Sequence, residues 1–307
     1  MDQTIDQERD EFLRSEIKKA GLGAILTWYP EDIVMSTGLL QCLGINLCLY
    51  PASGTPQFFG PANEPEDVFP GFAECHRFNL GPGWHADASR LIGDALARLR
   101  IRPDELGIAG DDGGHAMTTF PGETPPLTHS VVTGDLFPSD DSTGGGPQLA
   151  PDLFTRLTLT KTSREQAAVR RANDVACIGL EAFYETIRPG ATEIDIAAAV
   201  EYAIHRCSGR DGSGYARGWA HVQGGENIYW GGTYSRSSGN ALAEGDLVII
   251  ELATCVDGSW SDLTRTTGVG TISDQKLELL GAVQDAQKRA IEAIRPGASH
   301  ESIHAAA

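Results

Sequence analysis

Residues 246–270, DLVIIELATCVDGSWSDLTRTTGVG, restrict the fold of this chain more than any other stretch. The run LVIIELATCV is long and rich in β-branched residues, and the run WSDLTRTTGVG follows it after a short gap. Between them stands Asp257-Gly258, a strong signal for a two-residue turn. The pattern predicts a β-hairpin in which Val256 pairs with Ser259 across the turn.

Two carboxylates, Glu251 and Asp262, lie inside these otherwise apolar and hydroxyl-rich strands. The predicted pairing places them as diagonal neighbours on one face, and only a one-residue bulge would separate them. Like charges this close repel each other, and a divalent cation between them would remove the repulsion. Many hairpins also carry acids that face solvent. The spacing alone therefore leaves two interpretations open, a metal or catalytic site and a solvated pair.

Length and charge narrow the class of protein. A chain of 307 residues suggests two domains, and a net charge of −18 argues against binding to nucleic acid or to an anionic membrane surface. The six cysteines show no CxxC spacing, which predicts reduced, mostly buried thiols. The acidic N-terminus resembles no targeting signal, and no apolar run approaches the roughly 18 residues of a membrane span. We expect a cytoplasmic protein.

The first part of the chain alternates helical and strand patterns. Helices are predicted at 7–20 and 86–100, and strands at 23–28, 45–50, 56–60 and 106–110. This alternation predicts an α/β domain over residues 1–152, in which a Gly- and Pro-rich linker begins at about residue 111. A long helix at 160–187 opens the second domain, which we place at residues 153–307.

The second domain repeats itself. AFYETIRPGATEIDIAAAV (182–200) recurs as AIEAIRPGASHESIHAAA (290–307), so that Arg188-Pro-Gly-Ala matches Arg295-Pro-Gly-Ala and Ile196 matches Ile303. Each copy predicts a helix, a turn and a second helix, as in a twofold repeat. The second copy stops within its second helix, before any strands that this helix could cover. We therefore expect the chain to be truncated at its C-terminus.

With these segments together, the chain resembles the pita-bread family of creatinases, prolidases, aminopeptidases P and methionine aminopeptidases. The resemblance rests on TKTSREQAAVRRAND, IRPGATEIDIAAA, SGYARGWAHVQGGEN, AEGDLVIIELATCVDGSWSDLTRTTGVG and the repeat. ERDEFLRSEIKKAGLGAILTWYPEDIVMSTGL resembles the smaller domain that precedes this fold in all of these except methionine aminopeptidases. The implied fold class is α/β, with a creatinase-like N-terminal domain and an incomplete pita-bread domain that has an internal pseudo-twofold repeat.

The resemblance implies a metallopeptidase that hydrolyses Xaa-Pro-type peptide bonds with two divalent metal ions (Mn, Co or Zn). Asp262 stands at the position that bridges the two ions, and Glu251 stands at the first ligand position, which is normally Asp. Glutamate keeps the charge and the oxygen donors but adds a methylene group. A later His and two later acids complete the site in relatives, and they would lie beyond Ala307. Residues 1–307 alone are therefore expected to be inactive.

The candidate substrate-binding residues are His221, Asn227 and Trp230. Many relatives place a substrate-contacting His five residues after the position of Asn227, where this chain has Gly232. Trp230, close by, is either a wall residue or a substrate contact. His221 is more simply explained as a histidine at the end of a strand. The implied partners are a small peptide or amide substrate and, as in family members with two domains, a second copy of the chain in a homodimer.

Two alternatives stay open. One is a metal-independent carbon–nitrogen hydrolase of the creatinase type, which the change from Asp to Glu251 and the absence of the upstream His favour. The other is a non-catalytic relative that binds protein partners, for which the charge of −18 makes basic partners conceivable. Metal content and the cleavage of Xaa-Pro dipeptides would separate the three interpretations.

Overall fold

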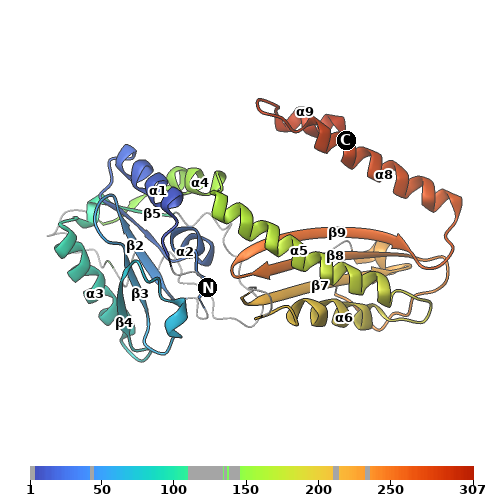
Figure 1. Ribbon diagram of the computed structural model, residues 1–307, viewed down its shortest axis with the longest axis horizontal. Helices are drawn as coiled ribbons and strands as arrows, with labels where there is room; N and C mark the ends of the chain where they lie inside the picture. Colours follow the sequence, from blue (N-terminus) through green and yellow to red (C-terminus); the bar gives the residue numbers. More distant parts are fainter. Residues whose placement is uncertain are drawn as a thin grey trace. The chain divides into compact units, whose positions relative to one another are not determined.

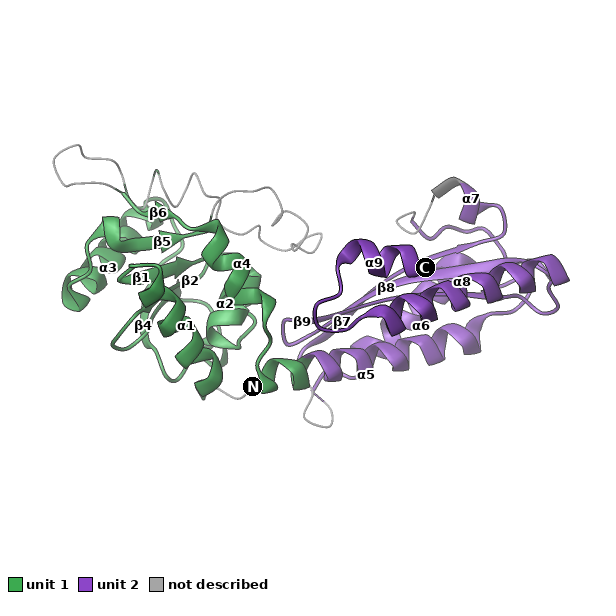
Figure 2. Ribbon diagram, turned by 90° about the horizontal axis from the view of Figure 1, so that it is seen from above, with its two compact units in different colours: residues 1–168 green, residues 169–307 purple. Residues whose placement is uncertain are grey.

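The computed structural model describes residues 4–41, 45–109, 134, 137, 146–209, 214–231 and 236–307. The chain forms two compact units, Met1–Ala168 and Val169–Ala307 (Figure 2). The division falls inside the long helix α5 (Ser163–Thr186). The domain boundary that the sequence suggests, between residues 152 and 153, stays a prediction. The two units are described separately below.

Unit 1 is built on a six-stranded mixed sheet with the strand order β4-β3-β2-β1-β5-β6 (Figure 1). Its central strands pair in antiparallel fashion, β1 with β2 and β2 with β3, while β3–β4, β1–β5 and β5–β6 are parallel. The strands are β1 (Ala24–Thr27), β2 (Leu47–Pro51), β3 (Gln57–Pro61), β4 (Glu74–Phe78), β5 (Leu106–Ile108) and β6 (Gln148–Leu149). All residues of β1, β2, β3 and β5 are buried, which makes this sheet the core of the unit.

Four helices pack around this sheet: α1 (Gln7–Lys19), α2 (Pro30–Thr37), α3 (Trp84–Leu99) and α4 (Pro151–Leu159). Short 3₁₀ turns lie at Glu66–Val68 and Pro103–Glu105. Helix α1 begins where the Asp6 side chain accepts a hydrogen bond from the Arg9 backbone N–H at 3.2 Å, as expected of an N-cap. The helices and strands predicted for this part are confirmed, although their ends shift by a few residues. The strands β4 and β6 and the helix α4 were not predicted, and most of the predicted linker lies outside the described residues.

Unit 2 contains an antiparallel sheet in the order β7-β8-β9, formed by Ala216–Gly224, Leu247–Val256 and Ser259–Gly268. Its helices are α5, α6 (Glu193–His205), α7 (Asn227–Gly231), α8 (Asp274–Ala293) and α9 (His300–Ala306). The predicted hairpin register is confirmed, because Val256 pairs with Ser259 across the turn. Asp257 and Gly258 both have positive φ, 50° and 85°, as a tight two-residue hairpin turn requires.

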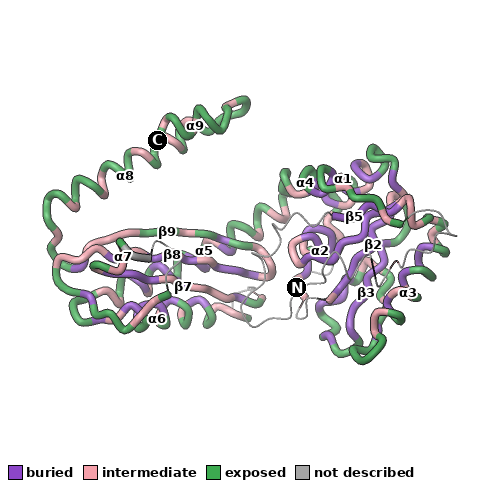
Figure 3. Tube along the Cα trace, turned by 180° about the vertical axis from the view of Figure 1, so that it is seen from behind, coloured by how far each residue is buried: buried purple, intermediate pink, exposed green. Residues whose placement is uncertain are grey.

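The two faces of this sheet differ in burial. Val248, Ile250 and Leu252 on alternate positions of β8 are fully buried and share a core with residues of α5 and α6. A fully buried side chain of this kind contributes roughly 1.5–3 kcal/mol to folding. Ser261 on β9 points to the same side, where its hydroxyl group lies 3.0 Å from the Asn173 side chain of α5. Residues 247, 249, 251 and 253 of β8 face the other way and are half-buried. Figure 3 shows buried and half-buried stretches in the strands of this sheet.

The predicted internal repeat is present in the backbone. Gly190 and Gly297, at matching positions of the two copies, both have a φ of 85°. The helix after each turn begins with a hydroxyl N-cap: Thr192 accepts a hydrogen bond from the Asp195 backbone N–H, and Ser299 accepts one from that of Ser302.

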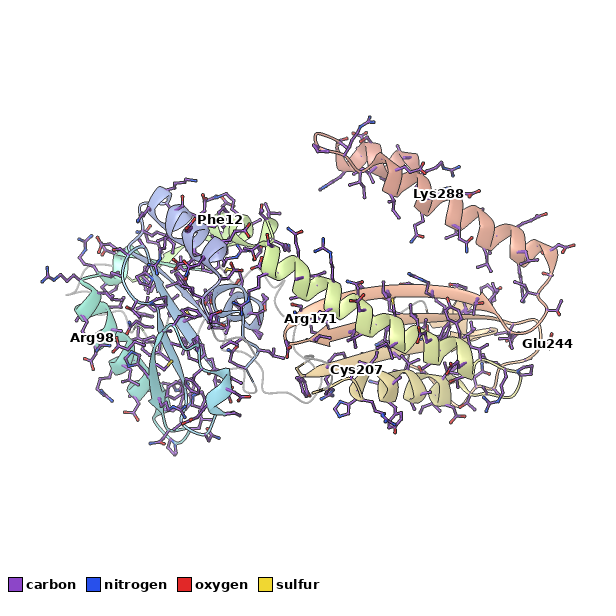
Figure 4. All side chains as sticks on the ribbon, viewed as in Figure 1. Phe12, Arg98, Arg171, Cys207, Glu244 and Lys288 are labelled. Carbon is purple, nitrogen blue, oxygen red and sulfur yellow. The ribbon has the colours of Figure 1, made fainter. Side chains whose placement is uncertain are left out.

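The two copies differ in burial. Helices α8 and α9 contain no buried residue, whereas α5 and α6 bury one face each. Side chains such as Lys288 extend outward from α8 (Figure 4).

Five cysteines lie in the described part of the chain, and none of them forms a disulfide. Cys48 and Cys255 are buried, but Cys75 and Cys177 are exposed, so the prediction of mostly buried thiols is wrong for these two. They lie on the edge strand β4 and on the outer side of α5, both at the surface. Among the described residues, no helix has the length and apolar composition to cross a membrane.

Candidate functional site

The open face of the β7–β8–β9 sheet brings the two predicted carboxylates together. Glu251 on β8 lies opposite Thr264 on β9, and Ala253 lies opposite Asp262. Glu251 and Asp262 are therefore diagonal neighbours on the face that points away from α5 and α6. The sequence predicted this arrangement from the position of the turn. The tight turn and the uninterrupted ladder of ten pairs leave no bulge that could separate the two side chains.

The neighbours of Glu251 shift the pKa of its carboxyl group in opposite directions. Partial burial raises the pKa of Glu251 above the usual value for glutamate, and both a hydrogen bond with Asp262 and the negative charge of Asp262 raise it further. The Thr264 hydroxyl donates a hydrogen bond to the Glu251 carboxylate, which lowers the pKa, and His221 lowers it as well. The net result is a raised pKa. Without a cation, the pair therefore carries an unfavourable electrostatic interaction.

The donor set of this pair suits a hard divalent cation, because carboxylate oxygens are the ligands such ions prefer. A cation bound by Glu251 and Asp262 would offset the repulsion that raises the pKa of Glu251. Within the described ranges, no cluster of three or more His, Cys, Asp or Glu side chains is close enough to hold a metal ion. The two carboxylates are thus able to supply part of a metal site, and further ligands would have to come from elsewhere.

His221 lies beside this pair. It is located inside β7, directly opposite Glu251, so its interpretation as a strand-end histidine is wrong. On the same face, Trp219 pairs with Ala253, and its ring stacks on that of Trp260 with 5.6 Å between the centroids. Trp260 is 41% exposed. The sequence did not suggest this aromatic pair, because Trp219 and Trp260 come close only once β7 and β9 have both paired with β8 in this register.

Asn227 follows β7, at the start of α7. Its side-chain amide nitrogen donates to the Glu193 carboxylate at 2.9 Å, and it lies 3.4 Å from the Ser238 hydroxyl. The N–H groups of Asn227 are therefore directed into the protein. Trp230 also lies in α7, and Gly232 is outside the described residues. The structure does not bring Asn227 into hydrogen-bond contact with Glu251 or Asp262.

Sequence reasoning missed Glu193, although it organises the segment around Asn227. The sequence Thr192-Glu193-Ile194-Asp195 signals the start of a helix, and an acid in the first turn is ordinary there. Nothing in the local pattern distinguishes Glu193, which is completely buried, from a solvent-facing acid of the same turn. Its burial depends on the loop at 236–242, which is distant in sequence.

Solved structures identify the fold class. Prolidase from Pyrococcus furiosus superposes with a TM-score of 0.71 at 20% sequence identity, over 96% of this chain and 76% of that structure. Xaa-Pro dipeptidase from Bacillus anthracis gives a TM-score of 0.69 at 21% identity, over 97% of this chain and 75% of the other. The chain thus has the mixed α/β architecture of prolidase-like, pita-bread structures.

Sequence comparison adds the family. Residues 167–307 match the model of metallopeptidase family M24. A probable dipeptidase PepE of Mycobacterium bovis is 31% identical over 225 residues, which are 72% of this chain and 58% of that protein. Residues 167–307 therefore form a domain of the pita-bread metallopeptidase family M24. It spans little more than half the length of this curated relative.

Proposed function

We propose that this chain is part of a metal-dependent hydrolase of Xaa-Pro-type peptide bonds. The observation that carries the proposal is the pair Glu251–Asp262, held in register on the open sheet face and destabilised by its own charge. Relatives named as dipeptidases and Xaa-Pro dipeptidases support the class of substrate. The location that we propose is the cytoplasm, and the assembly is a homodimer.

In this proposal, Glu251 and Asp262 would hold divalent cations together with further ligands from outside the described residues. Such cations, when bound, would polarise the scissile carbonyl group and lower the pKa of a bound water molecule. Thr264 holds the Glu251 carboxylate in place through its hydroxyl group. The acidic face favours a substrate that carries a free amino group. Trp219 and Trp260 form an apolar wall beside the carboxylates.

The test is the substitution Asp262→Ala in the full-length protein. We expect it to remove bound metal, measured by mass spectrometry, and to lower the cleavage of Xaa-Pro dipeptides at least about a hundredfold, since the loss of a ligand acts on both. Asp174→Ala, on the exposed side of α5, is the matched control and should change neither quantity. Wild-type protein that cleaves these dipeptides without bound metal would contradict the proposal and favour a creatinase-type hydrolase. Absence of both metal and cleavage would favour a binding protein.

A further inference from the structure

Glu193, the first residue of α6, is completely buried, and the proposed chemistry does not use it. Its two carboxylate oxygens accept hydrogen bonds from the segments that leave β7 and that lead into β8. The donors to Oε1 are Gly224 N at 2.8 Å, Asn227 Nδ2 at 2.9 Å and Asn240 Nδ2 at 3.4 Å, and the donors to Oε2 are Ser238 N at 3.0 Å and Ser238 Oγ at 2.7 Å. Five donors therefore converge on one buried side chain.

The backbone of the same helical turn completes the connection. The Glu193 backbone N–H donates to the Asn240 carbonyl at 3.1 Å, and the Ile194 N–H donates to the Ser238 carbonyl at 3.0 Å. These N–H groups at the start of a helix have no partner within the helix itself. The first turn of α6 and residues 238–240 thus hold each other by side-chain and backbone bonds.

The hydrogen-bond pattern requires a carboxylate. Each of these five partner groups of the Glu193 side chain is a donor, and an ionised carboxylate can accept from all of them. A glutamine of the same shape would direct its own N–H groups at some of these donors. Leaving buried donors unpaired is costly, so such a substitution should release the segment from the helix.

Comparison of the two repeat copies shows which residues of the first copy have an equivalent in the second and which do not. The cap Thr192 has its counterpart in Ser299, which makes the same N-cap bond. Glu193 has its counterpart in His300, which is exposed. The carboxylate is therefore not needed to build a helix, an Arg-Pro-Gly-Ala turn and a second helix. It is specific to the copy whose neighbouring segment contains Asn227.

We propose that Glu193 is a positioning residue, which fixes the path of residues 224–229 and 236–240 between β7 and β8 and thereby sets the affinity for substrate rather than for metal. For the substrate, this inference rests on the proposed function and on the prediction from the sequence that Asn227 and Trp230 bind the peptide. Glu193 acts through Asn227 and Ser238 and does not itself touch the reacting groups.

The test compares Glu193→Gln with Glu193→Asp in the full-length protein. In the Gln variant, we expect the backbone amides of Gly224 and Ser238 to exchange hydrogen about tenfold faster, while the amides of β8 and β9 keep their rates. KM for an Xaa-Pro dipeptide should rise about tenfold, with kcat changed less than about threefold and metal content unchanged. The Asp variant keeps the acceptors and should recover part of both effects. Glu226→Gln, an exposed acid in the same segment, is the control for lost charge.

Three results would overturn the inference. Unchanged exchange at Gly224 and Ser238 would show that Glu193 does not hold the segment. Faster exchange throughout β7, β8 and β9 would show a contribution to stability alone. Faster exchange that is confined to the amides of Gly224 and Ser238, together with an unchanged KM, would show that the segment does not set the affinity for substrate. If the wild-type protein cleaves no Xaa-Pro dipeptide, the proposed function is wrong. In that case, faster exchange confined to Gly224 and Ser238 in the Gln variant, with metal binding retained, still supports the positioning role of Glu193.

Discussion

At the scale of single residues, the environment of Glu251 conflicts with the negative charge of its side chain. A hydroxyl donor from Thr264 favours the ionised form, whereas partial burial and Asp262 disfavour it, and the net effect is a raised pKa. An acid whose pKa is raised on folding binds its proton more tightly in the folded state than in the unfolded state. Its contribution to stability is therefore greatest at low pH, and it is lost as the pH rises through and above the ordinary value near 4.5.

The substitution Glu251→Gln should consequently stabilise the metal-free protein at neutral pH. We expect a gain of about 0.2–1 kcal/mol in the free energy of unfolding, which is the usual scale for removing a like-charge neighbour in a sheet. Urea unfolding with a chelator present should show this gain at pH 7 and little difference below pH 4. Added Mn²⁺ should reverse the order of stability, because the variant has lost a ligand. The control Glu278→Gln, on exposed α8, should show neither effect. If Mn²⁺ stabilised the wild-type protein and the Glu251→Gln variant equally, Glu251 would not be a metal ligand.

Sequence reasoning was most successful where the information is local. Asp257-Gly258 determines the turn, the turn determines the register, and the register places Glu251 beside Asp262. It failed for His221, whose position opposite Glu251 depends on the pairing of β7 with β8, and on the long connection between them. The burial of Glu193 could not be predicted either, because the loop that covers it is some forty-five residues away in the chain.

At the scale of secondary-structure elements, α5 and α6 pack closely at Gly179. A Cβ atom at this position would lie 2.7 Å from Cδ1 and 3.0 Å from Cγ1 of Ile204, closer than packed carbon atoms allow. Gly281 in α8 has no heavy atom within 4 Å of such a Cβ. The two helical glycines therefore share a low helix propensity but differ in the space around them.

Gly179→Ala and Gly281→Ala should have effects of opposite sign. Alanine at 281 should stabilise its helix by about 0.5–1 kcal/mol, because the propensity gain is unopposed. At 179, overpacking against Ile204 should outweigh that gain and leave a net loss of about 1–3 kcal/mol. Thermal unfolding of the two variants beside the wild type measures both changes. A stabilised Gly179→Ala protein would mean that α5 and α6 separate without cost.

Two of the strands that the sequence did not predict, β4 and β6, have weak local patterns. Strand β4 is an edge strand in which only Phe78 is buried, so it lacks the alternation that marks a half-buried strand. Strand β6 has two residues, both exposed. The repeat was predictable, because each copy carries the same turn, glycine and cap, and these residues act locally.

At the scale of the whole molecule, the charge of −18 provides a second way in which a divalent cation could stabilise the protein. Cations that collect around an acidic chain reduce its general self-repulsion and would act on both units. A cation bound at Glu251 and Asp262 would act on unit 2, which contains the hairpin.

Hydrogen exchange with and without Mn²⁺ distinguishes these two effects. At a Mn²⁺ concentration about a hundred times the dissociation constant, binding to the folded state alone adds about 2.7 kcal/mol, so the most protected amides of β8 and β9 should exchange about a hundredfold more slowly. The amides of β1 and β2 in unit 1 should keep their rates, since that sheet is not part of the site. Asp262→Ala should abolish the change in unit 2. Equal protection of both units, or protection that persists in the Asp262→Ala variant, would mean that Mn²⁺ acts through the total charge and that the carboxylate pair is a solvated one.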